Sequence, residues 1–205
     1  MTRILRETRL LCILVLTAVC CCMPALAATT QVQIVRYAND NVTILSETNV
    51  TYQWMMSNLP VLGDGVTHYY HQGPVFIDDD NETLEQELRW NLEENSNVEE
   101  KDQGAVKGTN LKDLCDLVGG MSPGEKVKVI SSDGFTKWFG YQNVYSYSSR
   151  EGPIGLTWYK DGTYPDSGYS DGLKLVWFAD NSTNPWGIHA FGNWDWHEAA
   201  APEYW

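Results

Sequence analysis

Asp-Gly dipeptides, which are typical of tight turns, recur along the second half of the chain and separate short apolar segments. The segments are too short for long helices, and they show either alternating apolar residues or a continuous apolar run, which predicts strands. Asp133-Gly134 is expected to form the turn of one hairpin. These strands are expected at 126–130, 135–139, 154–159 and 173–178. The sequence therefore predicts an α+β fold that is mainly β, a mixed sheet domain with short helices.

The first half adds a hairpin and two helices. Residues 31–37 and 42–45 read as two strands joined by a turn at 39–41. The apolar spacing over 47–59 predicts a helix with Thr48 or Thr51 as its cap. A second helix is expected at 111–118, capped by Thr109, with residues 111, 114, 115 and 118 on one buried face. A short strand at 75–77 and one or two helical turns near 84–90 complete the prediction.

The N-terminus has the layout of a secretory signal peptide. Three arginines precede an apolar run of about 14 residues, and the small-residue pattern Ala25-Leu26-Ala27 follows. An uncleaved anchor is the first alternative, but the run is shorter than the ~20 residues of a spanning helix. A lipoprotein anchored at Cys20 is the second, although Val19 is a poor residue to precede a lipidated cysteine. We expect cleavage after Ala27 and one extracytoplasmic domain, residues 28–205, secreted or held at the cell surface.

Cleavage changes both the charge and the cysteine content. Residues 1–27 hold three arginines and one glutamate, so their removal takes the net charge from −13 to −15. Such acidity disfavours nucleic acid and anionic membranes as partners, and no membrane span is expected in the mature chain. Four of the five cysteines also leave, and Cys115 alone remains. An intramolecular disulfide is then impossible.

The four histidines form two pairs that predict a metal site. They are His68 and His71, in an H-x-x-H pattern, and His189 and His197 near the C-terminus. Imidazole is the commonest ligand of zinc and copper in proteins. Three or four of these rings, or three with Asp64 or Asp195, would complete such a site. The alternative is that they are ordinary hydrogen-bonded histidines in an aromatic cluster.

Aromatic residues surround both histidine pairs and suggest a ligand pocket. Tyrosine and tryptophan rings beside carboxylates are a common platform for sugars. The candidate pocket residues are Asp64, Tyr69, Tyr70, Trp186 and Trp194. The alternative is that these rings fill a hydrophobic core.

Two further features concern the surface. Residues 78–103 form an acidic insertion without the alternating ligands and central glycine of a calcium loop, so a solvated charged face is the simpler interpretation. Four Asn-x-Thr sequons make the exported chain a candidate glycoprotein. Their asparagines are Asn41, Asn49, Asn81 and Asn181.

The segment 107–120 (KGTNLKDLCDLVGG), followed by 127–135 (VKVISSDGF), resembles the oxidoreductase molybdopterin-binding domain, the sulfite-oxidase fold. A helix ending in Leu59-Pro60 and a closing strand pair near 173–188 fit the same family pattern. The resemblance implies a sulfite-oxidase-like mixed sheet and a molybdopterin cofactor. Enzymes of that family ligate molybdenum with a cysteine after the Leu-Pro helix, and residues 61–74 contain none.

The chain also resembles secreted archaeal proteins of unassigned role, found largely in methanogens, in the phrases at 63–74 and 184–197. Together these observations predict an exported, cell-surface binding or structural module. Its His- and Trp-lined pocket would hold a metal ion or small ligand, and cell-surface glycans or proteins would be its partners. The alternative is an enzyme, a divergent molybdopterin- or metal-dependent oxidoreductase. No catalytic motif identifies a reaction.

Overall fold

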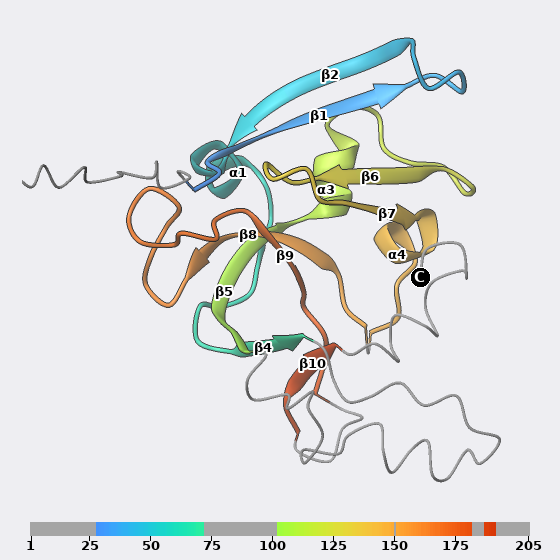
Figure 1. The fold of residues 1–205 in the computed structure, drawn as a ribbon. Helices are drawn as coiled ribbons and strands as arrows, with labels where there is room; N and C mark the ends of the chain where they lie inside the picture. Colours follow the sequence, from blue (N-terminus) through green and yellow to red (C-terminus); the bar gives the residue numbers. More distant parts are fainter. Residues whose placement is uncertain (1–27, 72–101, 150, 182–186, 192–205) are drawn as a thin grey trace, which may run out of the picture.

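The computed structural model describes residues 28–71, 102–149, 151–181 and 187–191, and the fold is mainly β, as predicted (Figure 1). The helices in these residues are α1 (Tyr52–Asn58), α3 (Leu111–Asp116) and α4 (Tyr141–Tyr145). The strands are β1 (Gln31–Tyr37), β2 (Ile44–Thr51), β3 (Val61–Leu62), β4 (His68–His71), β5 (Asp102–Asn110), β6 (Lys126–Ile130), β7 (Thr136–Gly140), β8 (Ile154–Lys160), β9 (Lys174–Trp177) and β10 (His189–Phe191).

Strand β5 is the centre of the main sheet, whose order is β10-β4-β5-β8-β9 with β3 also paired to β5. Its neighbours β3, β4 and β8 run antiparallel to it, whereas β10 runs parallel to β4. The sheet is therefore mixed. Most of β5 is buried, and from Gly104 to Asn110 every side chain except that of the half-buried Lys107 is short and neutral, which suits a central strand.

Helix α3 packs against β5 and β8 and presents the apolar stripe that the sequence predicts. Residues 111, 114, 115 and 118 are all buried. The helix is capped by the side chain of Asn110, which accepts a hydrogen bond from the Lys112 N–H at 2.9 Å. Thr109, the predicted cap, instead lies in β5, and its hydroxyl accepts a hydrogen bond from the buried Trp158 indole at 3.1 Å.

Two hairpins lie outside the main sheet, β1–β2 and β6–β7 (Figure 1). Val32, Ile34 and Val50 of the first hairpin face the core formed by α1, α3 and β8. Val127, Val129 and Phe139 of the second face Leu111 and Cys115 of α3, among other side chains. Each hairpin therefore has one buried face and one face toward solvent.

The helix expected at 47–59 is shorter in the structure. Residues up to Thr51 belong to β2, because pairing with β1 continues to the Gln31–Thr51 position. Thr51 is nevertheless a cap, as the sequence suggested, and accepts a hydrogen bond from the Trp54 N–H at 3.2 Å. Tyr52 and Met55 are buried, so the predicted apolar face is confirmed for α1.

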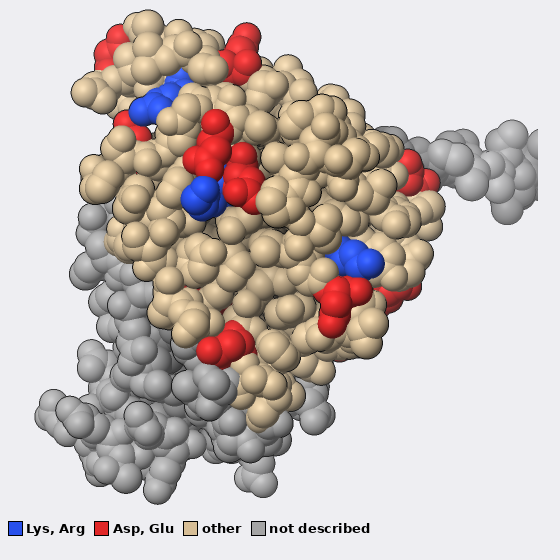
Figure 2. All heavy atoms as spheres, turned by 180° about the vertical axis from the view of Figure 1, so that it is seen from behind, with Lys and Arg blue, Asp and Glu red and all other residues tan. Residues whose placement is uncertain are grey.

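The acidic insertion also ends earlier than expected, because Asp102 and Gln103 are the first residues of β5. The strand predicted at 75–77 and the helical turns predicted near 84–90 lie outside the described residues. Figure 2 shows one face of the molecule on which charged side chains are sparse and the visible cationic groups lie beside acidic ones. No helix within the described ranges is long and apolar enough to cross a membrane.

Candidate functional site

Strands β4 and β10 bring together the two histidine segments that the sequence singled out. They pair in parallel, with His189 opposite Tyr69 and Phe191 opposite His71. Three of the four predicted ligands therefore lie on adjacent strands, although some 120 residues separate them along the chain. His197, Trp186 and Trp194 lie outside the described residues.

The H-x-x-H pair lies on a strand, and this separates its two rings. Successive side chains of a strand point to opposite faces, so residues three apart do not share a face. His68 is exposed, and its Nδ1 lies 2.7 Å from an Asp102 carboxylate oxygen. His71 is half-buried on the opposite face. The expectation that both rings point to one metal ion holds for a helix or a turn, and β4 is neither.

The inner face of β4 and β10 is an aromatic cluster made with β9. The Tyr69 ring contacts Phe178 at 4.7 Å and His189 at 5.3 Å between centroids. The Trp177 ring stacks on Phe191 at 4.6 Å with an interplanar angle of 9°. This is the packing that the simpler interpretation of the histidines predicts.

His71 joins β4 to β9 through its side chain. Its Nε2 accepts a hydrogen bond from the backbone N–H of Trp177 at 3.0 Å. Accepting this bond requires an unprotonated Nε2, so the ring is neutral and carries its proton on Nδ1. Burial, assisted by the charge of Lys174, lowers the pKa of His71 from its usual 6.5 to about 3. The nitrogen that would bind a metal is therefore already used to hold two strands together.

His189 has a similar structural bond. Its Nδ1 lies 2.7 Å from the carbonyl oxygen of Ala179, so Nδ1 carries the proton and donates. Ala179 follows β9 in the chain, and this bond ties β10 to the residues after β9. Within the described part of the chain, no three His, Cys, Asp or Glu side chains converge to hold a metal ion.

Asp64, one of the predicted pocket residues, stabilises the loop before β4. Its carboxylate accepts hydrogen bonds from the N–H groups of Val66 and Thr67 and from the Thr67 hydroxyl. These bonds hold the pKa of Asp64 at about 2. The carboxylate is therefore ionised and occupied by the turn. Tyr69 is buried, which raises its pKa, and Tyr70 is half-buried.

Cys115 belongs to the core. It packs with Leu111, Phe139, Val144 and Ile154, and burial raises the pKa of its thiol to about 12. A metal-binding cysteine must be deprotonated and accessible, so this thiol does not fit a molybdenum ligand. The segment after α1, residues 61–71, contains no cysteine. The residues described here therefore do not fit a molybdopterin centre of the sulfite-oxidase type.

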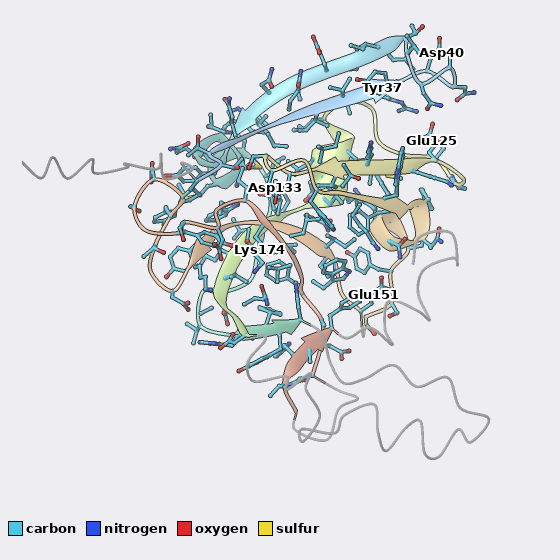
Figure 3. The ribbon with its side chains drawn as sticks, in the orientation of Figure 1. Tyr37, Asp40, Glu125, Asp133, Glu151 and Lys174 are labelled. Carbon is cyan, nitrogen blue, oxygen red and sulfur yellow. The ribbon has the colours of Figure 1, made fainter. Side chains whose placement is uncertain are left out.

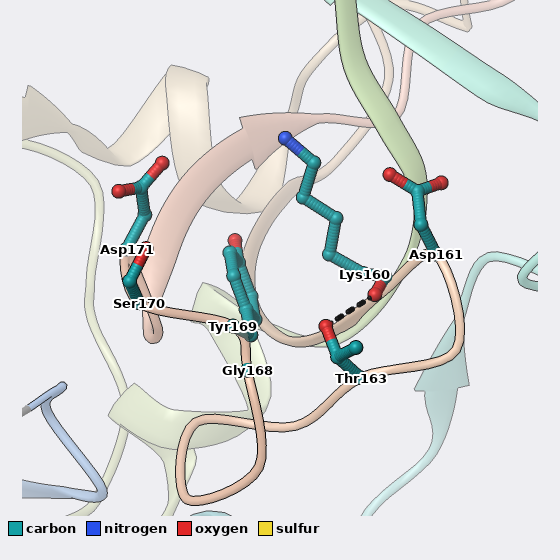
Figure 4. A pocket seen from close by; sticks show the side chains of 7 residues that line it. All are labelled: Lys160, Asp161, Thr163, Gly168, Tyr169, Ser170 and Asp171. Carbon is teal, nitrogen blue, oxygen red and sulfur yellow. Dashed lines mark hydrogen bonds between the residues drawn. The ribbon is translucent and has the colours of Figure 1, made fainter.

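A pocket of about 240 Å³ lies at the end of β8 (Figure 4). Two of its polar side chains are engaged in the fold: the Thr163 hydroxyl donates to the Lys160 carbonyl at 2.8 Å, and Asp161 accepts the Ala105 N–H at 2.8 Å. None of the residues nominated from the sequence lines it. The lining residues are Lys160, Asp161, Thr163, Gly168, Tyr169, Ser170 and Asp171.

The sequence analysis missed the partners of the histidines. Trp177, Phe178 and Phe191 complete the aromatic cluster, yet each looks in the sequence like an ordinary strand residue. It also missed Glu151, a buried carboxylate three residues before β8 begins. Its position between Arg150 and Gly152 reads as a turn, so the sequence held no sign of its burial.

Comparison of the chain with protein-family models, with curated proteins and with solved structures finds no match in any of the three.

Proposed function

We propose that the chain is an exported, cell-surface binding or structural module with a sulfite-oxidase-like fold that lacks the molybdenum-ligating cysteine. The hydrogen bonds of the histidines are the observation that supports a non-catalytic role. His71 and His189 bond to the backbone of β9 and of the residue Ala179 beyond it, and His68 bonds to Asp102 at the start of β5. Their role is to join β4 to β5 and to tie the β10–β4 side of the sheet to β9 and the residue after it.

The mixed sheet and the segment leading into it support the proposed fold. Strand β5, helix α3 and hairpin β6–β7 follow one another over 102–140, and this range contains the two segments that resemble the molybdopterin-binding family. Cys115 lies on the buried face of α3, where an apolar residue would serve equally. The proposed protein therefore has the architecture of the family without its redox chemistry.

The proposed location rests on the N-terminal sequence and on the sequons. Asn41, Asn49 and Asn181 are all exposed, as a glycosylation site must be, and Asn81 lies outside the described residues. Glycans or other proteins of the cell surface are the proposed partners.

Export is tested by the N-terminus of the purified protein. We expect Ala28 as the first residue after expression in a secreting host, with a mass that lacks residues 1–27. Retention of the complete N-terminus in a membrane fraction, or a lipid on Cys20, would contradict cleavage after Ala27.

The metal hypothesis is tested by elemental analysis for zinc, copper and molybdenum. We expect each metal well below one atom per chain, even after reconstitution, because His71 Nε2 already accepts the Trp177 N–H and no three potential ligands converge within the described residues. One atom of zinc or copper per chain, lost in both His68→Ala and His189→Ala but kept in a Lys107→Ala control, would overturn the non-metal interpretation. One atom of molybdenum would favour the oxidoreductase.

A further inference from the structure

The β1–β2 hairpin exposes apolar side chains near its turn. Tyr37, Val42, Ile44 and Leu45 are between 48% and 78% exposed there, and Glu47 is exposed beside them. We call these five residues the arm face. Tyr37 and Ile44 are opposite one another in the ladder, so their side chains share the face turned away from the core. Figure 3 shows Tyr37 and Asp40 at the end of the hairpin.

The hairpin is held in place on the body of the protein. Arg36 points to the other face, where its guanidinium donates to the Gly119 carbonyl at 2.6 Å and to Glu125 at 3.2 Å. The Asp40 carboxylate accepts the N–H groups of Val42 and Thr43 and so fixes the turn. The arm face is therefore preformed, and a partner that binds it does not first have to order it.

The outer face of the β6–β7 hairpin combines apolar side chains with lysines. Ile130, Phe135 and Trp138 are 62%, 68% and 45% exposed, and Lys126 and Lys128 are exposed next to them. We call these five residues the hairpin face. Lys128 lies opposite Trp138 in the ladder, with its Nζ 5.6 Å from the centre of the indole ring. This is a local cationic surface on a chain of net charge −13.

The two faces complement each other in charge and in apolar character, and one molecule cannot join its own two faces. The inner faces of both hairpins pack on the core, so both outer faces point away from it. We propose that the arm face of one copy docks on the hairpin face of a second copy, with Glu47 of one beside Lys128 of the other. A docking of two identical faces is disfavoured, because it would bring Glu47 to Glu47 or lysine to lysine.

Because the two faces differ, the contact is heterologous, and the docked pair keeps one unused arm face on one copy and one unused hairpin face on the other. Repetition therefore gives an open chain or a closed ring rather than a two-fold dimer. The inference goes beyond the proposed function, since it depends neither on export nor on a metal. It does require that two residues carry no glycan in the associating protein: Asn41, in the turn next to Val42, and Asn49, which lies on the outer face two residues from Glu47.

Sedimentation velocity of charge-reversal variants tests the proposal. The purified chain is first shown by intact mass to carry no glycan. We expect concentration-dependent association of the wild type that weakens about tenfold or more in Glu47→Lys and in Lys128→Glu. An equimolar mixture of these two variants restores association, because Glu47 of one meets Lys128 of the other. Asp171→Lys, which changes the net charge as Glu47→Lys does but lies on the β8–β9 loop, leaves association at least as strong as in the wild type.

Thermal unfolding separates loss of association from loss of fold. Variants that melt within a few degrees of the wild type are folded, and only these are compared. The proposal is overturned if the wild type is monomeric up to millimolar concentration, or if neither charge reversal weakens association. It is also overturned if two folded variants fail to associate when mixed, or if the protein from its native host carries glycans on Asn49 and still associates.

Discussion

The Nε2 atom of His71 accepts the backbone N–H of Trp177 at 3.0 Å, and the two rings meet edge to face with their centroids 5.3 Å apart. Strands β4 and β9 belong to opposite sides of the main sheet, since β5 and β8 lie between them. The sheet therefore curls until its β4 and β9 sides meet, and a side chain, rather than a backbone ladder, supplies this bond between them. A partner for the N–H group is needed because an unpaired buried donor costs roughly 1–3 kcal/mol.

This bond predicts a stability that depends on pH. The pKa of His71 is about 3 in the folded protein and about 6.5 in the unfolded chain, so between these values the unfolded state binds one more proton. The contribution of His71 to the free energy of unfolding should therefore be complete above pH 6.5 and should be lost progressively as the pH is lowered toward 3. The slope approaches about 1 kcal/mol per pH unit. Urea unfolding at a series of pH values measures it.

Two substitutions at this position separate the titration of His71 from its role as a hydrogen-bond acceptor. In His71→Asn the amide oxygen can accept the same N–H but does not titrate, so most of the slope between pH 6.5 and 4 should disappear. In His71→Phe the acceptor is lost, and stability should fall by roughly 1–3 kcal/mol at every pH. Asp40 and Asp64, whose pKa values lie near 2, affect stability only below about pH 4 and do so equally in all three proteins. An unchanged slope in His71→Asn would contradict the assignment.

Local patterns identified most of the elements that form hairpins. The strands near 126–130 and 135–139 and the apolar stripe of α3 appear as predicted, because alternation and turn residues act over only a few positions. Strand β5 was missed, although it is the centre of the sheet. Its Gly104, Gly108 and Asn110 are poor strand formers. Gly108 is required at its position because a neighbouring backbone passes close by: a Cβ there would lie 2.7 Å from the Leu156 carbonyl oxygen.

The candidate site was predicted only in part, for a similar reason. The sequence singled out His68, His71 and His189, and the strands that carry them, β4 and β10, pair with one another. It did not show that β4 is a strand, and that single fact turns His68 and His71 to opposite faces. The bond from His71 to Trp177 joins residues 106 positions apart, and no local pattern records such a contact.

A glycine before β8 should be hard to replace. Gly152 has a φ of 71°, and a Cβ there would lie 2.1 Å from the Phe178 carbonyl oxygen. Because that oxygen belongs to the backbone, it cannot move aside easily, and we expect Gly152→Ala to destabilise the protein by about 2 kcal/mol or more. Gly134→Ala is the matched control, with a φ of 88° and no atom within 4 Å of the added carbon, and should cost only the backbone strain of about 1 kcal/mol. Equal losses in thermal or urea unfolding would contradict the clash.

The cap of α1 is open to a direct measurement. Thr51→Ala removes the oxygen that accepts the Trp54 N–H and should lower the free energy of unfolding by about 1 kcal/mol. Thr51→Ser keeps that oxygen and should stay close to the wild type. Both variants must be compared without glycans, because Thr51 is also the third residue of the Asn49 sequon. A loss in Thr51→Ser as large as that in Thr51→Ala would show that the methyl group, rather than the cap, stabilises the helix.

The thiol of Cys115 should be protected by the fold. Its pKa of about 12 and its position in the core predict almost no reaction with a chromogenic disulfide at pH 8 in the native protein, and complete reaction in denaturant. The number of thiols that react in denaturant also shows whether residues 1–27 have been removed. A chain cleaved after Ala27 has one, whereas the uncleaved chain has five. Fast reaction of the native, cleaved protein would contradict the burial of Cys115. The cleaved Cys115→Ala variant has no thiol, so it gives the background reading of the reagent. Its free energy of unfolding should fall by only about 1 kcal/mol, since loss of a small side chain leaves a small cavity.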